Sequence, residues 1–209
     1  MDYPVSVEVA PSLTGRNRLT TFFRLILAIP HLILVGGAGT VAASRGDRTT
    51  TVSGESGLLG AVAWFLAVVS WFTIVFGGVH LPGIRQFTTF YLRWRLRVLG
   101  YVSLLQDPYP PFGDGPYPTE LTVTDPAGPR NRLTVAFRLL LVLPHVVLLF
   151  FVLVAWLCTT VIAWFAILFT ARMPEGLHRF GTGALRWRLR VEAYMLLLVD
   201  DYPPFGFTN

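Results

Sequence analysis

The sequence predicts a mainly α-helical integral membrane protein, built from two tandem copies of one unit and crossing the membrane four times. Hydrophobic residues make up 53% of the chain and charged residues only 14%, a balance typical of proteins that lie in lipid. Two long apolar runs, 58–81 and 135–171, each exceed the roughly 20 residues needed to cross a bilayer. A long motif is also written twice.

The repeated motif establishes an internal duplication. Arg-Trp-Arg-Leu-Arg-Val, then Tyr, Leu-Leu, Asp and Tyr-Pro-Pro-Phe-Gly, occupies 93–113 and returns 93 residues later at 186–206. Near the start of each copy, Arg-Asn-Arg-Leu-Thr occupies 16–20 and returns 114 residues later at 130–134. So many identical residues at a constant offset do not arise by chance. We therefore divide the chain into a first repeat, 1–115, and a second repeat, 116–209.

Each copy opens with a short strand. Residues 3–11 alternate valine with polar residues, which is the period of a half-buried strand, and 117–123 repeat this pattern in the second copy. We expect the two strands to pair with each other. An isolated two-stranded ribbon is marginally stable, so the pair would need helices beneath it.

A first membrane helix follows the strand in each copy. Arg24 and Arg138 lie shortly after its basic beginning, where their side chains would reach the lipid headgroups by snorkelling. Pro30 removes a backbone donor and should kink the first of these helices.

The copies differ after this helix. The first copy inserts a polar loop, 36–57, before its next apolar run, whereas the second copy has no polar break. The Trp-Phe pairs at 64–65 and 164–165 align at an offset of 100, which makes the first copy longer by 14 residues in this region. Two copies of one unit should share a topology, so we expect a two-helix membrane hairpin in both, turning near 154–160 in the second. The alternative is a single long kinked helix there.

An amphipathic helix should then lie at the membrane surface. Pro82 and Pro174 end the apolar runs and turn the chain. At 3.6 residues per turn, Phe180, Trp187 and Tyr194 share one face with other apolar residues, and arginines line up beside it. Arg188 and Glu192 stand four apart and are placed to pair.

The arginines predict an orientation. All 17 basic residues are arginines, and in the four-span arrangement 15 of them lie on one side of the membrane. The positive-inside rule then places both termini in the cytoplasm of a multi-pass protein. An even number of spans in each copy makes the repeats parallel, related by an axis along the membrane normal.

These motifs together resemble one uncharacterised family. The Arg-Asn-Arg-Leu-Thr entry, the Pro-His helix, the Arg-Trp-Arg helix and the terminal Asp-x-Tyr-Pro-Pro-Phe are similar to those of actinobacterial membrane proteins grouped as a domain of unknown function, family 4389. The resemblance covers nearly the whole chain in two copies. It implies a bacterial inner-membrane protein and supplies no activity.

The arginine- and aromatic-rich face is the leading candidate site. Its guanidinium groups suit phosphate headgroups, so we expect a non-enzymatic module that binds anionic lipid or a partner membrane protein. The alternative is that the arginines pair with Asp107, Asp200 and Asp201 and anchor the helices. The candidate residues are Arg16, Arg93, Trp94, Arg97, Arg130, Arg186, Trp187 and Arg190.

A second candidate site involves two equivalent histidines. His31 and His145 follow a proline in the first membrane helix of each copy, and kinked helices in a repeat could line a transport pathway at the midplane. This is the alternative function, a small transporter or carrier. Hydrogen bonding between helices is the simpler role for these imidazoles.

Other function classes find no support in the sequence. It holds no nucleophile–base order, paired-carboxylate spacing, Cys-x-x-Cys or phosphate loop, so we predict no enzyme activity, cofactor or metal. The pI near 9.9 comes without an aromatic RNA platform or a major-groove helix, so we predict no nucleic-acid partner. The single cysteine, Cys158, cannot form an internal disulfide.

Overall fold

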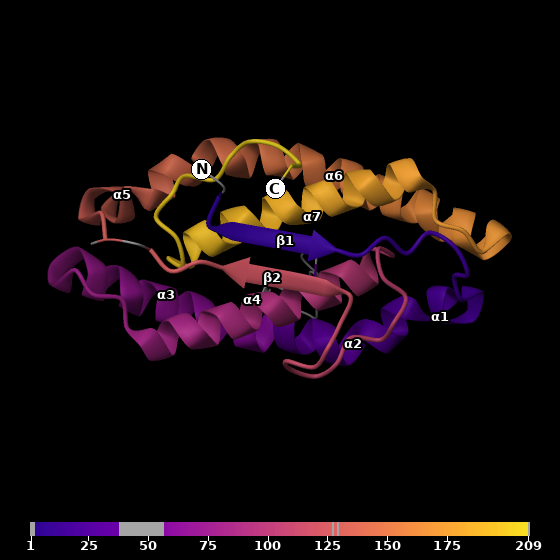
Figure 1. The fold of residues 1–209 in the computed structure, drawn as a ribbon, viewed down its shortest axis with the longest axis horizontal. Helices are drawn as coiled ribbons and strands as arrows, with labels where there is room; N and C mark the ends of the chain where they lie inside the picture. Colours follow the sequence, from indigo (N-terminus) through magenta and orange to yellow (C-terminus); the bar gives the residue numbers. More distant parts are fainter. Residues whose placement is uncertain (1–2, 38–56, 127, 129, 209) are drawn as a thin grey trace, which may run out of the picture.

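The computed structural model describes residues 3–37, 57–126, 128 and 130–208 (Figure 1). Each half of the chain opens with a short strand that helices follow, four in the first half and three in the second among the described residues. The elements are β1 (Val5–Val9), α1 (Arg18–Phe22), α2 (Arg24–Val35), α3 (Gly57–Gly77), α4 (Pro82–Val102), β2 (Thr119–Val123), α5 (Arg132–Ala136), α6 (Arg138–Thr170) and α7 (Glu175–Met195). The boundary between repeats at 115 and 116 stays a prediction.

The two strands pair with each other, as predicted. They are antiparallel, with Val7 opposite Leu121, and these two residues occupy equivalent places 114 positions apart. A pseudo-twofold axis therefore passes through their pair, perpendicular to the ribbon. In Figure 1 a half-turn about the centre of the picture carries the elements of one copy onto those of the other.

The copies exchange their N-terminal elements. β1 of the first copy packs on α7 of the second, and β2 of the second copy packs on α4 of the first. The short helices do the same, because α1 contacts α6 and α5 contacts α3. Each copy therefore completes the fold of the other.

The second copy contains no membrane hairpin, so that prediction is wrong. α6 is one helix of 33 residues, because its sequence offers no charged residue, glycine or further proline where a turn was expected. The first copy builds the same rod from two helices. A side chain at Gly57 would collide with the backbone nitrogen of Gly36, so α3 begins where α2 ends. The predicted loop falls largely on 38–56, outside the described residues.

The alignment of the Trp-Phe pairs was also wrong. Trp71, not Trp64, is the equivalent of Trp164: its Nε1 donates to the Val135 carbonyl at 3.1 Å, as Trp164 Nε1 donates to Thr21 at 3.1 Å. The offset changes from 114 before the interruption to 93 after it, so the first copy is longer by 21 residues there. Trp64 and Phe65 lie seven residues before the true equivalents, and a shift of seven residues keeps a side chain near the same helix face.

Four membrane spans are not supported. Within the described residues, two helices are long and apolar enough to cross a membrane, Gly57–Gly77 and Arg138–Thr170. α2 has only 12 residues and forms one rod with α3. The orientation drawn from the arginines assumed four crossings, so it no longer follows from their distribution.

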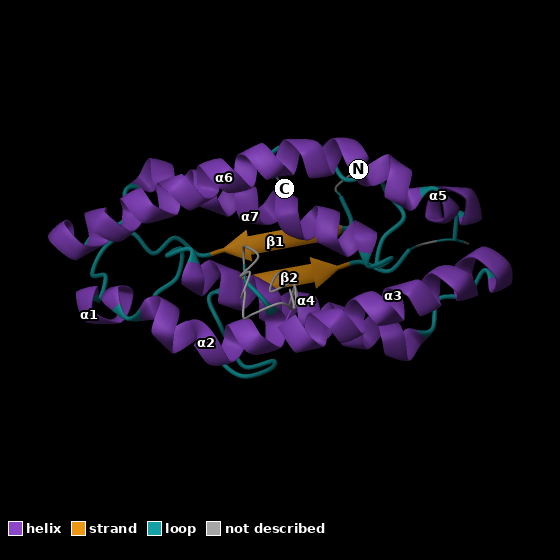
Figure 2. Ribbon diagram, turned by 180° about the vertical axis from the view of Figure 1, so that it is seen from behind, coloured by secondary structure: helices purple, strands orange, loops and turns teal. Residues whose placement is uncertain are grey.

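The molecule has three layers. In Figure 1 the strands lie in front, α4 and α7 lie behind them, and α6 with the α2–α3 rod lies farthest back. Figure 2 shows the opposite side, with the long outer helices toward the viewer. α7 is therefore a middle layer and not the surface helix that its arginines suggested: residues 181–185 and 187–191 are buried. The strands on one side and α6 on the other cover it.

Candidate functional site: the arginine clusters and the apolar back layer

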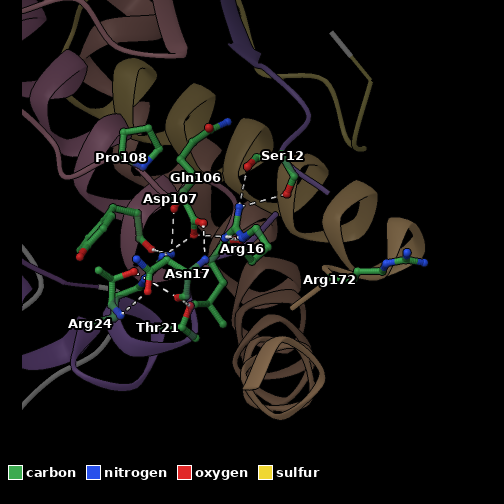
Figure 3. Close-up of polar contacts among 12 residues, drawn as sticks. Ser12, Arg16, Asn17, Thr21, Arg24, Gln106, Asp107, Pro108 and Arg172 are labelled. Carbon is green, nitrogen blue, oxygen red and sulfur yellow. Dashed lines mark hydrogen bonds and ion pairs between the residues drawn. The ribbon is translucent and has the colours of Figure 1, made fainter. Parts of the chain in front are cut away.

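A carboxylate held by two arginines joins the start of the first copy to the end of α4 (Figure 3). Asp107 forms ion pairs with Arg16 at 3.0 Å and with Arg24 at 2.7 Å, and both arginines are almost completely buried. The backbone N–H of Asn17 donates to the other carboxylate oxygen at 3.0 Å. Asn17 also caps α1 with its side chain, so one short segment starts the helix and aims the arginines.

The same arginines satisfy the carbonyls at the end of α4. Leu104 has a φ of 65° in the left-handed region, which closes the helix, and its carbonyl accepts from Arg16 at 2.5 Å. Arg24 donates to the carbonyls of Tyr101 at 3.0 Å and Gln106 at 2.8 Å. Cations are favoured at this end of a helix because its carbonyl dipoles point outward.

The second copy repeats this arrangement. Asp200 forms ion pairs with Arg130 at 2.9 Å and with Arg138 at 3.0 Å, and the guanidinium of Arg138 stands 4.2 Å from the centre of the Tyr194 ring. Burial lowers the pKa of Arg16 to about 10 and also lowers that of Arg130, while the neighbouring aspartate opposes the shift in each case. We call each set of two arginines and one aspartate an arginine clamp.

The arginines of the Arg-Trp-Arg helices hold the exchanged strands. Arg93 of α4 donates to the Leu121 carbonyl of β2 at 3.2 Å, and Arg186 of α7 donates to the Val7 carbonyl of β1 at 2.9 Å. Each bond occupies an edge carbonyl of the two-stranded ribbon. Arg97 and Arg190 donate to the carbonyls of Gly113 and Gly206 in the C-terminal tail of their own copy.

The two predicted histidines lie in separate aromatic boxes. Trp94 Nε1 donates to Nδ1 of His31 at 3.1 Å, and Phe112 stacks on the imidazole with ring centres 4.2 Å apart. Trp187 and Phe205 surround His145 in the same way, at 3.1 Å and 4.0 Å. No group of three or more histidine, cysteine or acidic side chains placed to hold a metal ion occurs in the described part of the chain.

One buried ion pair joins α4 to α7, and the sequence did not predict it. Glu192 of α7 pairs with Arg95 of α4 at 2.9 Å and accepts from Tyr91 at 3.2 Å. The predicted partner, Arg188, instead donates to the Gly37 carbonyl at 3.5 Å, which Arg95 also contacts. The first copy has Leu99 where the second has Glu192, so the two copies differ in charge at this position.

The back layer exposes large apolar side chains along its whole length. On α6 the exposed fraction is 68% for Leu139, 66% for Leu157 and 76% for Phe169, and the buried residues lie on the opposite helix face. α1, α2, α3 and α5 contribute similar residues. They include Leu19, Phe22, Leu25, Ile29, Ile33, Val62, Phe65, Phe72, Phe76, Leu133 and Phe137.

A comparison with protein-family models identifies the chain. Residues 56–113 and 132–206, together more than half of the sequence, match the model described as a domain of unknown function, DUF4389. The chain belongs to the DUF4389 family. The match covers α3, α4 and the following tail in the first copy and α5 to α7 with their tail in the second. No curated protein and no solved structure matches the chain.

Several features that the DUF4389 sequence did not reveal join the two copies. An arginine four residues from a glutamate predicted a bond within one helix, whereas the glutamate bonds across the axis. The repeated Asp-x-Tyr-Pro-Pro-Phe was a usable signal for the clamps, because it recurs in step with the arginines.

Proposed function

We propose that this DUF4389 protein is a non-enzymatic membrane module whose back layer lies in lipid. The observation that carries the proposal is the apolar surface of α6 and the α2–α3 rod, which extends from one end of the molecule to the other. Soluble proteins rarely expose apolar patches of more than a few hundred Å². Lipid chains would cover this surface without requiring a shaped partner.

The front of the molecule has the opposite character. Glu8, Glu120 and Thr122 point away from the helices and are exposed, while Val7 and Leu121 point inward and are buried. The polar front and the apolar back make the molecule two-faced. This asymmetry favours contact with a bilayer through one face of the molecule over packing of other copies of the chain around all of its faces.

Aromatic tails and exposed cations surround the back layer. Both C-terminal tails cross in front of the outer helices in Figure 1, and they expose Tyr109, Phe112, Tyr202 and Phe205. Such residues favour the membrane–water interface. Arg18, Arg132, Arg172 and Arg179 are exposed and lie at element ends, where they suit anionic headgroups. We therefore propose anionic lipid as the preferred ligand, in a bacterial inner membrane.

Vesicle flotation tests the lipid-facing surface. Leu157→Asp with Phe165→Asp places two charges on the exposed face of α6, where each costs about 2.5–3.5 kcal/mol at the centre of a bilayer. We expect at least a tenfold loss of binding to phosphatidylcholine vesicles containing phosphatidylglycerol. Thr122→Asp, on the polar face of β2, is the matched control and should bind normally.

The opposite result is equally informative. If the parent stays in solution as an oligomer and does not float with vesicles, another copy of the chain covers the back layer. Retention of full binding by the double aspartate variant would show that lipid contacts a different surface.

A further inference from the structure

We infer that the molecule lies flat in one leaflet, with its pseudo-twofold axis along the membrane normal and its long helices parallel to the bilayer surface. The inference rests on the proposed lipid contact of the back layer and adds its orientation. The two helices that are long enough to cross a membrane would then not cross it. Three features of the structure favour this arrangement.

The first feature is the length of the outer helices. Exposed apolar side chains on α6 run from Leu139 to Phe169, which is about 45 Å at 1.5 Å per residue. The hydrocarbon core of a bilayer is only about 30 Å thick. A tilt of about 40°, the upper end of the usual range, still leaves apolar residues in water at the ends. A helix lying in the plane covers all of them.

The second feature is the position of the charged strands. β1 and β2 lie midway along the long axis of the molecule in Figure 1. If α6 crossed the membrane, Glu8 and Glu120 would face the middle of the bilayer, where ionised side chains are costly. The two glutamates also stand directly opposite each other in the ribbon, so their negative charges repel. Water and salt screen this repulsion, whereas lipid does not.

The third feature is the open ribbon itself. Within the described residues the sheet has two strands and therefore an edge on both sides, and Arg93 and Arg186 occupy one central carbonyl on each. Open sheet edges do not occur facing lipid within the hydrocarbon region, because their polar groups find no partner there. With the axis along the normal, the ribbon lies in water and both apolar rods lie at one depth.

Depth measurements along α6 test the orientation. Leu140, Val147, Cys158 and Phe165 are exposed and lie within about 20° of one another around the helix, because 18 residues make five turns. Each carries a bimane label in turn: Cys158 in the parent, and a cysteine at the other positions in the Cys158→Ser background. Lipids with nitroxides at graded depths, in phosphatidylcholine and phosphatidylglycerol vesicles, report each label's distance from the bilayer centre.

We expect all four labels at one depth, to within about 3 Å. A crossing helix would instead place 140 and 165 about 25 Å or more apart along the normal, with 147 and 158 nearest the centre. Glu120→Cys, also in the Cys158→Ser background, supplies the second measurement. It should react fully with a membrane-impermeant maleimide added outside the vesicles.

The outcomes separate the two proposals. Flotation with a depth profile that peaks in the middle of α6, or with Glu120→Cys protected, overturns the flat orientation and leaves lipid binding intact. Failure of the unlabelled parent to float overturns lipid binding itself. Circular dichroism of each variant, matched to the parent, confirms that the labelled chains are folded.

Discussion

At the scale of residues, the molecule depends on charged groups that it buries. Each arginine clamp places two guanidinium groups against one carboxylate, and other donors of the same arginines bond to carbonyls at a helix end. Removing one charge of a buried ion pair destabilises a protein more than replacing both charges by apolar residues, because the remaining charge stays buried without a partner. The shared carboxylate is thus the most sensitive position.

Asp107→Asn should therefore destabilise the fold. The change keeps the shape of the side chain but leaves Arg16 and Arg24 without a counter-charge, and we expect a loss of about 3 kcal/mol in the free energy of unfolding. Urea unfolding in detergent, followed by tryptophan fluorescence, measures it. Asp114→Asn is the control: Asp114 is half exposed and stands 3.7 Å from Arg97, so its loss should cost less than about 1 kcal/mol. Equal effects of the two variants would contradict a structural role for the clamp.

At the scale of elements, a repeated unit need not keep the same number of helices. The α2–α3 rod is interrupted after Gly36, and its counterpart α6 continues without a break. Both rods pack on the helix that follows them, α4 or α7, and the tryptophan at the same place in each rod bonds to the short helix of the other copy. The packing face is therefore the same whether the rod is one helix or two.

The strand-holding arginines give an element-scale prediction. Arg93→Gln with Arg186→Gln removes the side-chain donors to Leu121 and Val7, and each loss should cost about 1 kcal/mol because the groups are only half buried. We expect lower stability in urea with little change in co-purified phosphatidylglycerol, measured by native mass spectrometry.

The exposed arginines supply the matched comparison. Changing Arg18, Arg132, Arg172 and Arg179 to glutamine should lower the amount of anionic lipid with a smaller effect on stability. If the strand-holding pair loses lipid and keeps its stability, the headgroup site lies on α4 and α7, as the sequence analysis proposed.

At the scale of the whole molecule, the contacts between the two repeats predict that they unfold as one cooperative unit. Each copy's strand and first short helix pack on the other copy, so neither half can bury its own core. This exchange resembles the interface of an intertwined dimer joined into one chain. Separation of the halves should expose the inward faces of α4 and α7.

Expression as two chains tests this dependence. Chains 1–115 and 116–209 should each fail to form a folded monomer, and together they should assemble one to one. Size-exclusion chromatography in detergent and thermal unfolding by circular dichroism measure the outcome. A half that unfolds cooperatively as a monomer would show that the exchange is not required.

The sequence by itself determined the duplication, the paired strands and the helical character of the chain. Repetition and alternation are local patterns, so they survive in the order of residues: Val5, Val7 and Val9 predict a strand without any partner in view. The predicted arginine and histidine sites also recur in the structure as symmetric sets, although their lipid or transport roles stay predictions.

Only the tertiary structure decided how the apolar runs are arranged. Hydropathy measures how apolar a segment is but not the direction in which it runs. The hydropathy of 135–171 is therefore compatible with a hairpin and with a single rod, and the structure shows the single helix α6. The partners of Arg93, Arg186 and Glu192 come from the other copy, at separations that no local pattern records. The placement of the ribbon halfway along the rods likewise follows from exchange between the copies, and that placement is the physical reason for expecting the molecule to lie flat in the membrane.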